Sequence, residues 1–265
     1  MQEKFSRMLI GNLLKSIRTE KKIPIKKVAQ NMDVSEATIS QFETGKNKPT
    51  NEKIALFAEI CGQTFNFALD RNLIMDRVYD IYDLYTDLKK EELNKTIQIV
   101  KETKNIACSY ARFEYYLILY MDAIINQKEV DTALYKGIIE LGKNNFSVRE
   151  LSIYYDIMAL EKIYSNEIKE ALGYLDKALS NKGNHLMINY HYCSIYLDLG
   201  YFNLAQQYIH KSLRMAVQQL SFDRLYYLLL NQGVLYMYTS RYDEANNIVF
   251  LTESSVSWNP SSQWS

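Results

Sequence analysis

Apolar residues recur at helical spacing along nearly the whole chain. Near the N-terminus, Leu9, Leu13 and Ile17 follow the helical period with polar side chains between them, which predicts a helix over residues 5–21. A second apolar stripe predicts another helix over residues 73–88. Only three prolines and nine glycines interrupt 265 residues, so we expect long helices joined by short turns. The pattern predicts an all-α protein.

A shorter helix is predicted inside residues 33–49, which read DVSEATISQFETGKNKP. Ser35 is suited to cap its N-terminus, because the hydroxyl accepts a hydrogen bond from an amide of the next turn. Ile39 and Phe42 lie three positions apart, so they share one face and can anchor the helix to a core. Gly45 ends the helix, because glycine adopts the left-handed conformation past a C-terminus at little cost.

The preceding segment predicts another short helix over residues 25–32, with Val28, Ala29 and Met32 on its buried face. A tight turn at Asp33 separates the two helices. Two helices joined by a tight turn and flanked by lysines are the arrangement of a helix-turn-helix. Entry into a major groove requires a short, polar outward face. The later helix has such a face, made of Glu36, Ala37, Thr38, Ser40 and Gln41.

The run VSEATISQFETGKNKPT resembles the Cro/C1-type (XRE) helix-turn-helix family, in which V-S-x-x-x-I-S-x-x-E-x-G-x-x-x-P marks the recognition helix. The resemblance spans residues 8–68 and implies a DNA-binding domain. It implies an ion pair between Glu43 and Arg18. It also implies base contacts from Glu36, Ala37, Thr38 and Gln41. Contacts to the DNA backbone are expected from Ser35, Ser40, Lys46 and Lys48.

Lys26 and Lys27 lie beside this motif, where such a cluster is either a phosphate-binding flank or plain solvated surface. We favour the flank because of its position. One departure from the family concerns the start of the second helix, where a Ser, Thr or Asn cap and a phosphate-binding Gln are usual. This chain has Pro24 and Ile25 instead, so that phosphate contact is not expected here.

The remaining chain predicts further helices and a division into parts. Thr50 is expected to cap a fourth helix that Gly62 terminates, and a short fifth helix over residues 65–72 would close the DNA-binding domain. We therefore place this domain at residues 1–70. The parts that follow are a linker helix at 71–88, a body at 89–252 and a tail at 253–265.

The body carries a weak internal repeat. Ala171 is followed by an apolar residue four positions on and a small residue three further, and Ala205 and Ala245 begin similar runs. The first two alanines are 34 residues apart, and a fainter copy centres on Ala133. This pattern resembles the tetratricopeptide repeat, which implies a right-handed helical solenoid. The last repeat lacks a second partner helix, so either a neighbouring subunit or a short frayed tail must end the stack.

Composition excludes several other classes. The chain is 48% hydrophobic and 23% charged, which is ordinary for a globular protein, and no apolar run approaches the ~20 residues of a membrane span. Residues 1–70 hold 11 Lys and Arg against 8 Asp and Glu, and the rest holds 20 against 23. A basic N-terminal part suits phosphate binding. The N-terminus does not read as a signal peptide, and three scattered cysteines suit a reducing cytoplasm.

No catalytic or metal-binding pattern stands out. The three histidines lack partners at metal spacing, and neither a glycine-rich phosphate loop nor a nucleophile motif is present. Cys61 is more simply a small buried apolar residue than a redox centre. We therefore expect neither an enzyme nor a cofactor.

The order and size of the parts resemble the peptide-responsive regulators of the RRNPP type (the Rgg/PlcR/PrgX-like group). That resemblance implies a cytoplasmic homodimeric transcription regulator of the quorum-sensing kind. A short imported signalling peptide would bind the repeat surface, and the two DNA-binding domains would read a palindromic operator. Polar and aromatic residues on the predicted inner helices are the candidates for peptide contact: Arg112, Tyr115, Asp122, Arg149, Tyr190, Tyr227 and Asn231.

Three alternatives remain open at the level of sequence. The chain could be a repeat protein whose N-terminal domain binds protein and never DNA. It could be a DNA-binding repressor controlled by a protein partner rather than a peptide. A peptide-controlled phosphatase or hydrolase is less favoured, because the catalytic residues for it are missing.

Overall fold

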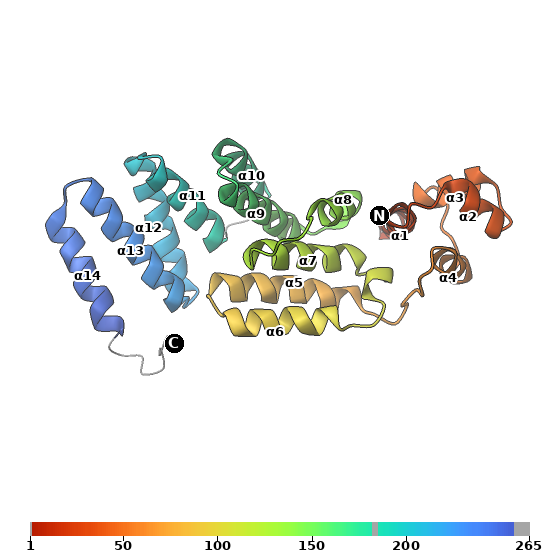
Figure 1. Cartoon of the computed structure of the whole chain (residues 1–265), viewed down its shortest axis with the longest axis horizontal. Helices are drawn as coiled ribbons and strands as arrows, with labels where there is room; N and C mark the ends of the chain where they lie inside the picture. The colour runs from red at the N-terminus through yellow and green to blue at the C-terminus, as the bar shows by residue number, and fades with distance from the viewer. Residues whose placement is uncertain (1, 182–184, 257–265) are drawn as a thin grey trace. The chain divides into compact units, whose positions relative to one another are not determined.

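The computed structural model describes residues 2–181 and 185–256, so most of the predicted tail at 253–265 lies outside the described residues. Over these residues the chain is helical, with fourteen α-helices and two short 3₁₀ helices, and the predicted all-α class is confirmed (Figure 1). The single pair of bridged residues in the described part of the chain joins Asn66 to Ser109.

The first four helices, which we call the head, occupy the red and orange part of Figure 1. They are α1 (Gln2–Glu20), α2 (Ile25–Asn31), α3 (Glu36–Glu43) and α4 (Asn51–Ile60). Thr50 caps α4 as predicted, since its hydroxyl accepts from the Lys53 amide at 3.4 Å, and Gly62 follows the helix with φ of 71°. The apolar residues that repeat at helical spacing form the core of the head: Leu13, Leu14, Ile17, Val28, Ile39, Phe42, Ile54 and Phe57.

The predicted fifth helix over residues 65–72 is wrong. This segment is irregular, and the next helix begins only at Arg71. The Asn66 amide donates to the Cys108 carbonyl at 2.8 Å, and the Asn66 side-chain amide donates to the Lys104 carbonyl at 3.0 Å. An amide bonded to a distant carbonyl cannot also join the hydrogen-bond ladder of a local helix. Long-range pairing therefore overrides the local pattern.

The chain folds into two compact units, each described by itself below. Unit 1 comprises Met1–Tyr82 and Lys90–Leu151, and unit 2 comprises Asp83–Lys89 and Ser152–Ser265. The predicted helix at 73–88 is present as α5 (Arg71–Thr86), which begins in unit 1 and ends in unit 2. Our division of the chain at residues 70, 88 and 252 stays a prediction.

Unit 1 joins the head to a second set of helices. These are α6 (Lys90–Lys101), α7 (Arg112–Ile125) and α8 (Ala133–Gly142), together with most of α5. The Arg112 side chain is fully buried; its Nε donates to the Ser16 hydroxyl at 2.7 Å, and its Nη2 contacts Glu20 Oε2, also at 2.7 Å. The Tyr116 hydroxyl donates to Glu20 Oε1 at 2.9 Å. These contacts attach α1 of the head directly to α7.

Unit 2 consists of paired helices. Its helices are α9 (Val148–Tyr164, from Ser152 onward), α10 (Ile168–Ser180), α11 (Leu186–Asp198), α12 (Phe202–Gln218), α13 (Phe222–Tyr238) and α14 (Tyr242–Val256). Ala171, Ala205 and Ala245, the small residues of the repeat, are all buried, and a Cβ added to Gly233 would lie 3.3 Å from Ile248. Small side chains at these positions let neighbouring helices approach closely, as the repeat predicts.

A buried carboxyl in unit 1 makes stability depend on pH. Glu114 Oε1 accepts from Arg71 Nε at 2.8 Å, but Glu114 Oε2 is buried without a hydrogen-bond partner among the described residues. Burial raises the pKa of the Glu114 carboxyl from 4.5 to about 7, against the opposing effect of Arg71. Between these two values the folded chain holds a proton that the unfolded chain has released, so stability falls as pH rises.

We therefore expect the free energy of unfolding to fall as pH rises through this window. Glu114→Gln should flatten the slope, because the amide does not titrate. Urea unfolding between pH 5 and pH 8, followed by circular dichroism, measures both chains. Equal slopes in the two chains would contradict the assignment.

Candidate nucleic-acid interface

Helix α3 has well-defined caps at both ends. The Thr38 amide donates to Ser35 Oγ at 3.1 Å, which confirms the predicted N-cap. At the C-terminus, Gly45 has φ of 67°; its amide donates to the Phe42 carbonyl at 3.0 Å, and the Lys46 amide donates to the Gln41 carbonyl at 2.9 Å. This pair of bonds is the Schellman ending that glycine permits. The caps define the length of α3 and the direction in which its loop leaves.

The inner face of α3 is anchored by apolar packing and by one ion pair. Ile39 is fully buried and Phe42 is 5% exposed. Arg18 Nε contacts Glu43 Oε1 at 2.5 Å and Arg18 Nη2 contacts Glu43 Oε2 at 2.8 Å, so the predicted pair is present and two-pronged. Arg18 also donates to the Ile23 carbonyl at 2.9 Å. One guanidinium thus fixes α3 and the turn before α2 to α1.

The turn between α2 and α3 also follows the prediction. Asp33 has φ of 50°, and the Val34 amide donates to the Ala29 carbonyl at 3.0 Å. Pro24 precedes α2 and provides no side-chain hydrogen bond to its first turn. The start of α2 therefore lacks the side-chain cap that is usual in the family.

The outer face of α3 is open to solvent. Glu36, Ala37, Ser40 and Gln41 are exposed, and Thr38 is half-buried. The four lysines of the flank, Lys26, Lys27, Lys46 and Lys48, are also exposed. Within the described part of the chain none of these lysines has an ion-pair partner, so their ammonium groups are available for phosphate. The structure thus places all the predicted DNA contacts on α2, on α3 or in the loops next to α3. Their roles in binding stay predictions.

One neighbour of this face was not singled out in the sequence. Asn47, in the loop after α3, donates from Nδ2 to Gln41 Oε1 at 2.5 Å, and its backbone amide donates to the Gln41 carbonyl at 3.1 Å. The sequence did offer a signal for this residue, because Asn47 lies between the two lysines of the GKNKP run.

The predicted peptide-contact residues divide between the two units. Arg112, Tyr115, Asp122 and Arg149 belong to unit 1, and Tyr190, Tyr227 and Asn231 belong to unit 2. Arg112 is engaged with α1, and Asp122 is 2% exposed and forms an ion pair with Lys128 at 2.7 Å. Arg149 lies over the Tyr79 ring at 4.2 Å. The polar atoms of Arg112 and Asp122 are therefore already bonded within unit 1.

Arg224 organises part of unit 2 near Tyr190. Its guanidinium lies 4.7 Å from the centre of the Tyr190 ring and donates to the Thr86 and Tyr85 carbonyls, each at 3.0 Å. These are carbonyls at the C-terminus of α5, where a cation is favourable. Tyr190 therefore belongs to the packing around the end of α5.

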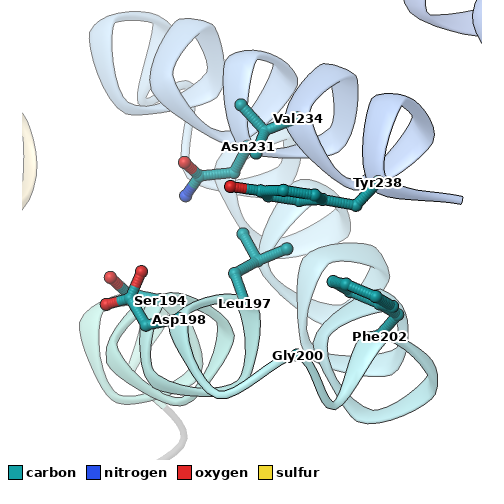
Figure 2. A pocket seen from close by; sticks show the side chains of 8 residues that line it. All are labelled: Ser194, Leu197, Asp198, Gly200, Phe202, Asn231, Val234 and Tyr238. Carbon is teal, nitrogen blue, oxygen red and sulfur yellow. The ribbon is translucent and has the colours of Figure 1, made fainter.

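Asn231 faces a pocket within unit 2, between α11, the start of α12 and α13 (Figure 2). The pocket holds about 400 Å³, and the Phe202 and Tyr238 rings stack at its side with centroids 5.5 Å apart. The Asp198 carboxylate is the charged group that lines the pocket. The full lining is Ser194, Leu197, Asp198, Gly200, Phe202, Asn231, Val234 and Tyr238. The pocket offers aromatic and aliphatic walls with an amide, a hydroxyl and a carboxylate.

One segment of the chain matches a known protein family. Residues 14–67 match the family described as helix-turn-helix. This segment is a helix-turn-helix domain. The match runs from the middle of α1 to the irregular segment after α4, so the helix-turn-helix domain contains Ser35, the exposed face of α3 and the four flanking lysines.

Comparisons of the whole chain add little. No curated protein matches this chain in sequence. Among solved structures, the chain is similar to PlcR in "Crystal Structure of Bacillus thuringiensis PlcR in complex with the peptide PapR7 and DNA". The two are 12% identical, the alignment covers 95% of this chain and 98% of that one, and the TM-score is 0.38.

Proposed function

We propose that this protein is a sequence-specific DNA-binding transcription regulator, rather than an enzyme, and that a short signalling peptide controls it. The observation that supports DNA binding best is the exposed polar face of α3 in the helix-turn-helix domain, flanked by four lysines without ion-pair partners among the described residues. A capped, anchored helix with such a face can enter a major groove without rearrangement.

Each side chain on this face has a matching chemistry. The Glu36 carboxylate can accept from the cytosine amino group, and the Gln41 amide can bond to purine edges. The Ala37 methyl can contact a thymine methyl, and Thr38 can bond to several bases. Lys26, Lys27, Lys46 and Lys48, with Ser35 and Ser40, would hold the phosphate backbone and set the register.

A homodimer on a palindromic operator follows from this proposal. A single short helix reads few base pairs, and paired domains read two half-sites about one helical turn apart. Helix α14 supports self-association, because Val249, Phe250 and Leu251 are 49%, 71% and 56% exposed. Apolar side chains of this size gain free energy when a partner surface covers them.

Unit 2 supports the peptide part of the proposal through its pocket. The Asn231 Nδ2 donates to Cys193 Sγ at 3.9 Å, which leaves its second hydrogen and Oδ1 as one donor and one acceptor for an extended peptide backbone. The stacked rings and the aliphatic walls would take an apolar side chain. A bound peptide changes DNA binding only if it favours one arrangement of the dimer over another.

The proposed setting is the cytoplasm, where DNA and an imported peptide meet. No helix in the described residues is both long enough and apolar enough to cross a bilayer.

The first prediction from this function concerns salt. Lys46→Gln with Lys48→Gln should lower the slope of log K against log salt concentration by about 2, because each lost phosphate contact releases about one counterion fewer. Binding of a 30-base-pair random duplex at several salt concentrations, followed by fluorescence anisotropy, measures this slope. Lys169→Gln, at an exposed site on α10, is the control and should leave the slope unchanged. Equal slopes in all three chains would contradict backbone contacts from the loop after α3.

The whole proposal is tested by selecting sites from a library of random duplexes with the full chain. Enrichment of a palindrome supports the dimeric regulator, and titration with short hydrophobic peptides encoded near the gene should then shift its affinity. Asn231→Ala should remove that shift and leave the affinity for DNA unchanged. Enrichment of nothing at moderate salt would favour an interaction module that does not bind DNA. Enrichment that no peptide alters would favour control by a protein partner.

A further inference from the structure

The loop after α3 holds one side chain of the DNA-reading face in a set orientation. Asn47 Nδ2 donates to Gln41 Oε1 at 2.5 Å, and the Asn47 backbone amide donates to the Gln41 carbonyl at 3.1 Å. The left-handed conformation of Gly45 and the two backbone hydrogen bonds at the end of α3 determine where this loop lies. The contact therefore joins a backbone-anchored asparagine to an exposed glutamine on the groove-facing side.

The orientation of the Gln41 amide decides what the residue can recognise. A free glutamine presents a donor and an acceptor together, which match the N7 acceptor and N6 donor of adenine. In this structure Oε1 already accepts from Asn47, so the Nε2 hydrogens are the groups turned away from the loop. Guanine offers two adjacent acceptors, O6 and N7, in the major groove. Because Oε1 is held toward the loop and the Nε2 hydrogens face away from it, the amide suits the two acceptors of guanine better than the acceptor and donor of adenine.

We propose that Asn47 is a specificity-determining positioning residue, which makes Gln41 select guanine over adenine at one position of each half-site. The inference rests on the proposed function, since it needs α3 to read DNA. Neither Lys46 nor Lys48 takes part in it, because the lysines contact phosphate and carry no base information.

Two substitutions at position 47 change the chemistry of Gln41 by different routes. Asn47→Ala removes the donor, frees the Gln41 amide to rotate and restores its match to adenine. Asn47→Asp keeps the size but replaces the donor with an acceptor, which attracts Gln41 Nε2 and turns Oε1 toward the groove. An outward oxygen accepts from the adenine or cytosine amino group and has no partner on guanine.

The test is site selection from random duplexes with the full chain, followed by competition between half-sites that differ only by guanine or adenine at each position. The wild-type chain should prefer guanine at one position. Asn47→Ala should shift the guanine-to-adenine ratio there toward adenine by roughly tenfold, and Asn47→Asp should shift it at least as far. A ratio cancels any general loss of affinity from the added charge or from reduced stability.

Two controls separate this effect from others. Gln41→Ala should abolish the preference, and adding Asn47→Ala to it should change nothing further. Asn31→Ala removes an exposed asparagine of α2 that donates to the Lys27 carbonyl, and it should leave the ratio as in the wild type. If the wild-type chain selects a sequence and neither Asn47 variant moves the ratio, the inference fails while the proposed function stands. If the wild-type chain selects no sequence, both fail.

Discussion

Replacing Glu20 with methionine is expected to lower the free energy of unfolding by about 3–5 kcal/mol, because it leaves the buried Arg112 guanidinium without a counter-charge. Arg112 is fully buried on α7, and Glu20 on α1 is its acidic partner at 2.7 Å. Burial opposes ionisation of Glu20, but hydrogen bonds from Arg112 and Tyr116 outweigh it, so the pKa of Glu20 lies below its ordinary value. Thermal and urea unfolding of the full chain measure the loss.

Substitution of the other partner, Arg112, provides a control for this pair. Arg112→Met should cost less, since the Glu20 side chain is 16% exposed and can reach water when the guanidinium is gone. The double variant should be more stable than the sum of the two losses predicts, because no unpaired charge remains. A loss in Glu20→Met no larger than that in Arg112→Met would show that the burial of the guanidinium does not govern this contact between head and α7.

Gly11→Ala is expected to displace α3, to cost about 3 kcal/mol and to reduce specific DNA binding by more than tenfold. A Cβ at Gly11 would lie 2.6 Å from the Phe42 carbonyl, 2.8 Å from the Glu43 carbonyl and 2.9 Å from the Gly45 amide nitrogen. These are backbone atoms at the end of the recognition helix, so they cannot rotate away as a side chain would. The clash can be relieved only if the backbone moves, so the loss of stability should lie at the upper end of the range usual for overpacking. Unfolding and binding to the selected operator measure the two effects.

A matched glycine in unit 1 serves as the control. Gly137 lies in α8, and a Cβ there would meet no atom within 4 Å. Gly137→Ala should raise stability by about 0.5–1 kcal/mol through helix propensity and leave DNA binding unchanged. If Gly11→Ala behaves like Gly137→Ala, then close packing of α1 against α3 does not position the recognition helix.

Much of the candidate interface could be predicted without coordinates because its signals are local. The Ser35 cap, the spacing of Ile39 and Phe42 and the ending at Gly45 all act within a few residues of each other. Such interactions form wherever the same residues occur in a helix, so their pattern can be recognised in the chain. The family resemblance added the pair between Arg18 and Glu43, which is also present.

The peptide-contact residues stay predictions, and for two of them the structure shows surroundings that the sequence did not indicate. Arg112 and Asp122 are polar and lie on the predicted helices, yet the structure buries both and satisfies them with partners of their own unit. Periodicity shows that a residue lies on one face of a helix, but not which neighbour that face meets. Asn231 lies in a pocket because α11 and α13 happen to approach there.

The sequence by itself determined the helical class, the helix-turn-helix and the exposed polar face of α3, because caps, turns and apolar period are properties of neighbouring residues. The tertiary structure alone decided that residues 65–72 pair with a distant segment, that Gly11 meets the end of α3 and that Asn47 orients Gln41. The first two of these depend on which segments come together in space. The third depends on the direction of a loop, which the helix end sets. The first two are therefore outcomes of packing, and the third depends on side-chain orientations that a residue pattern does not specify.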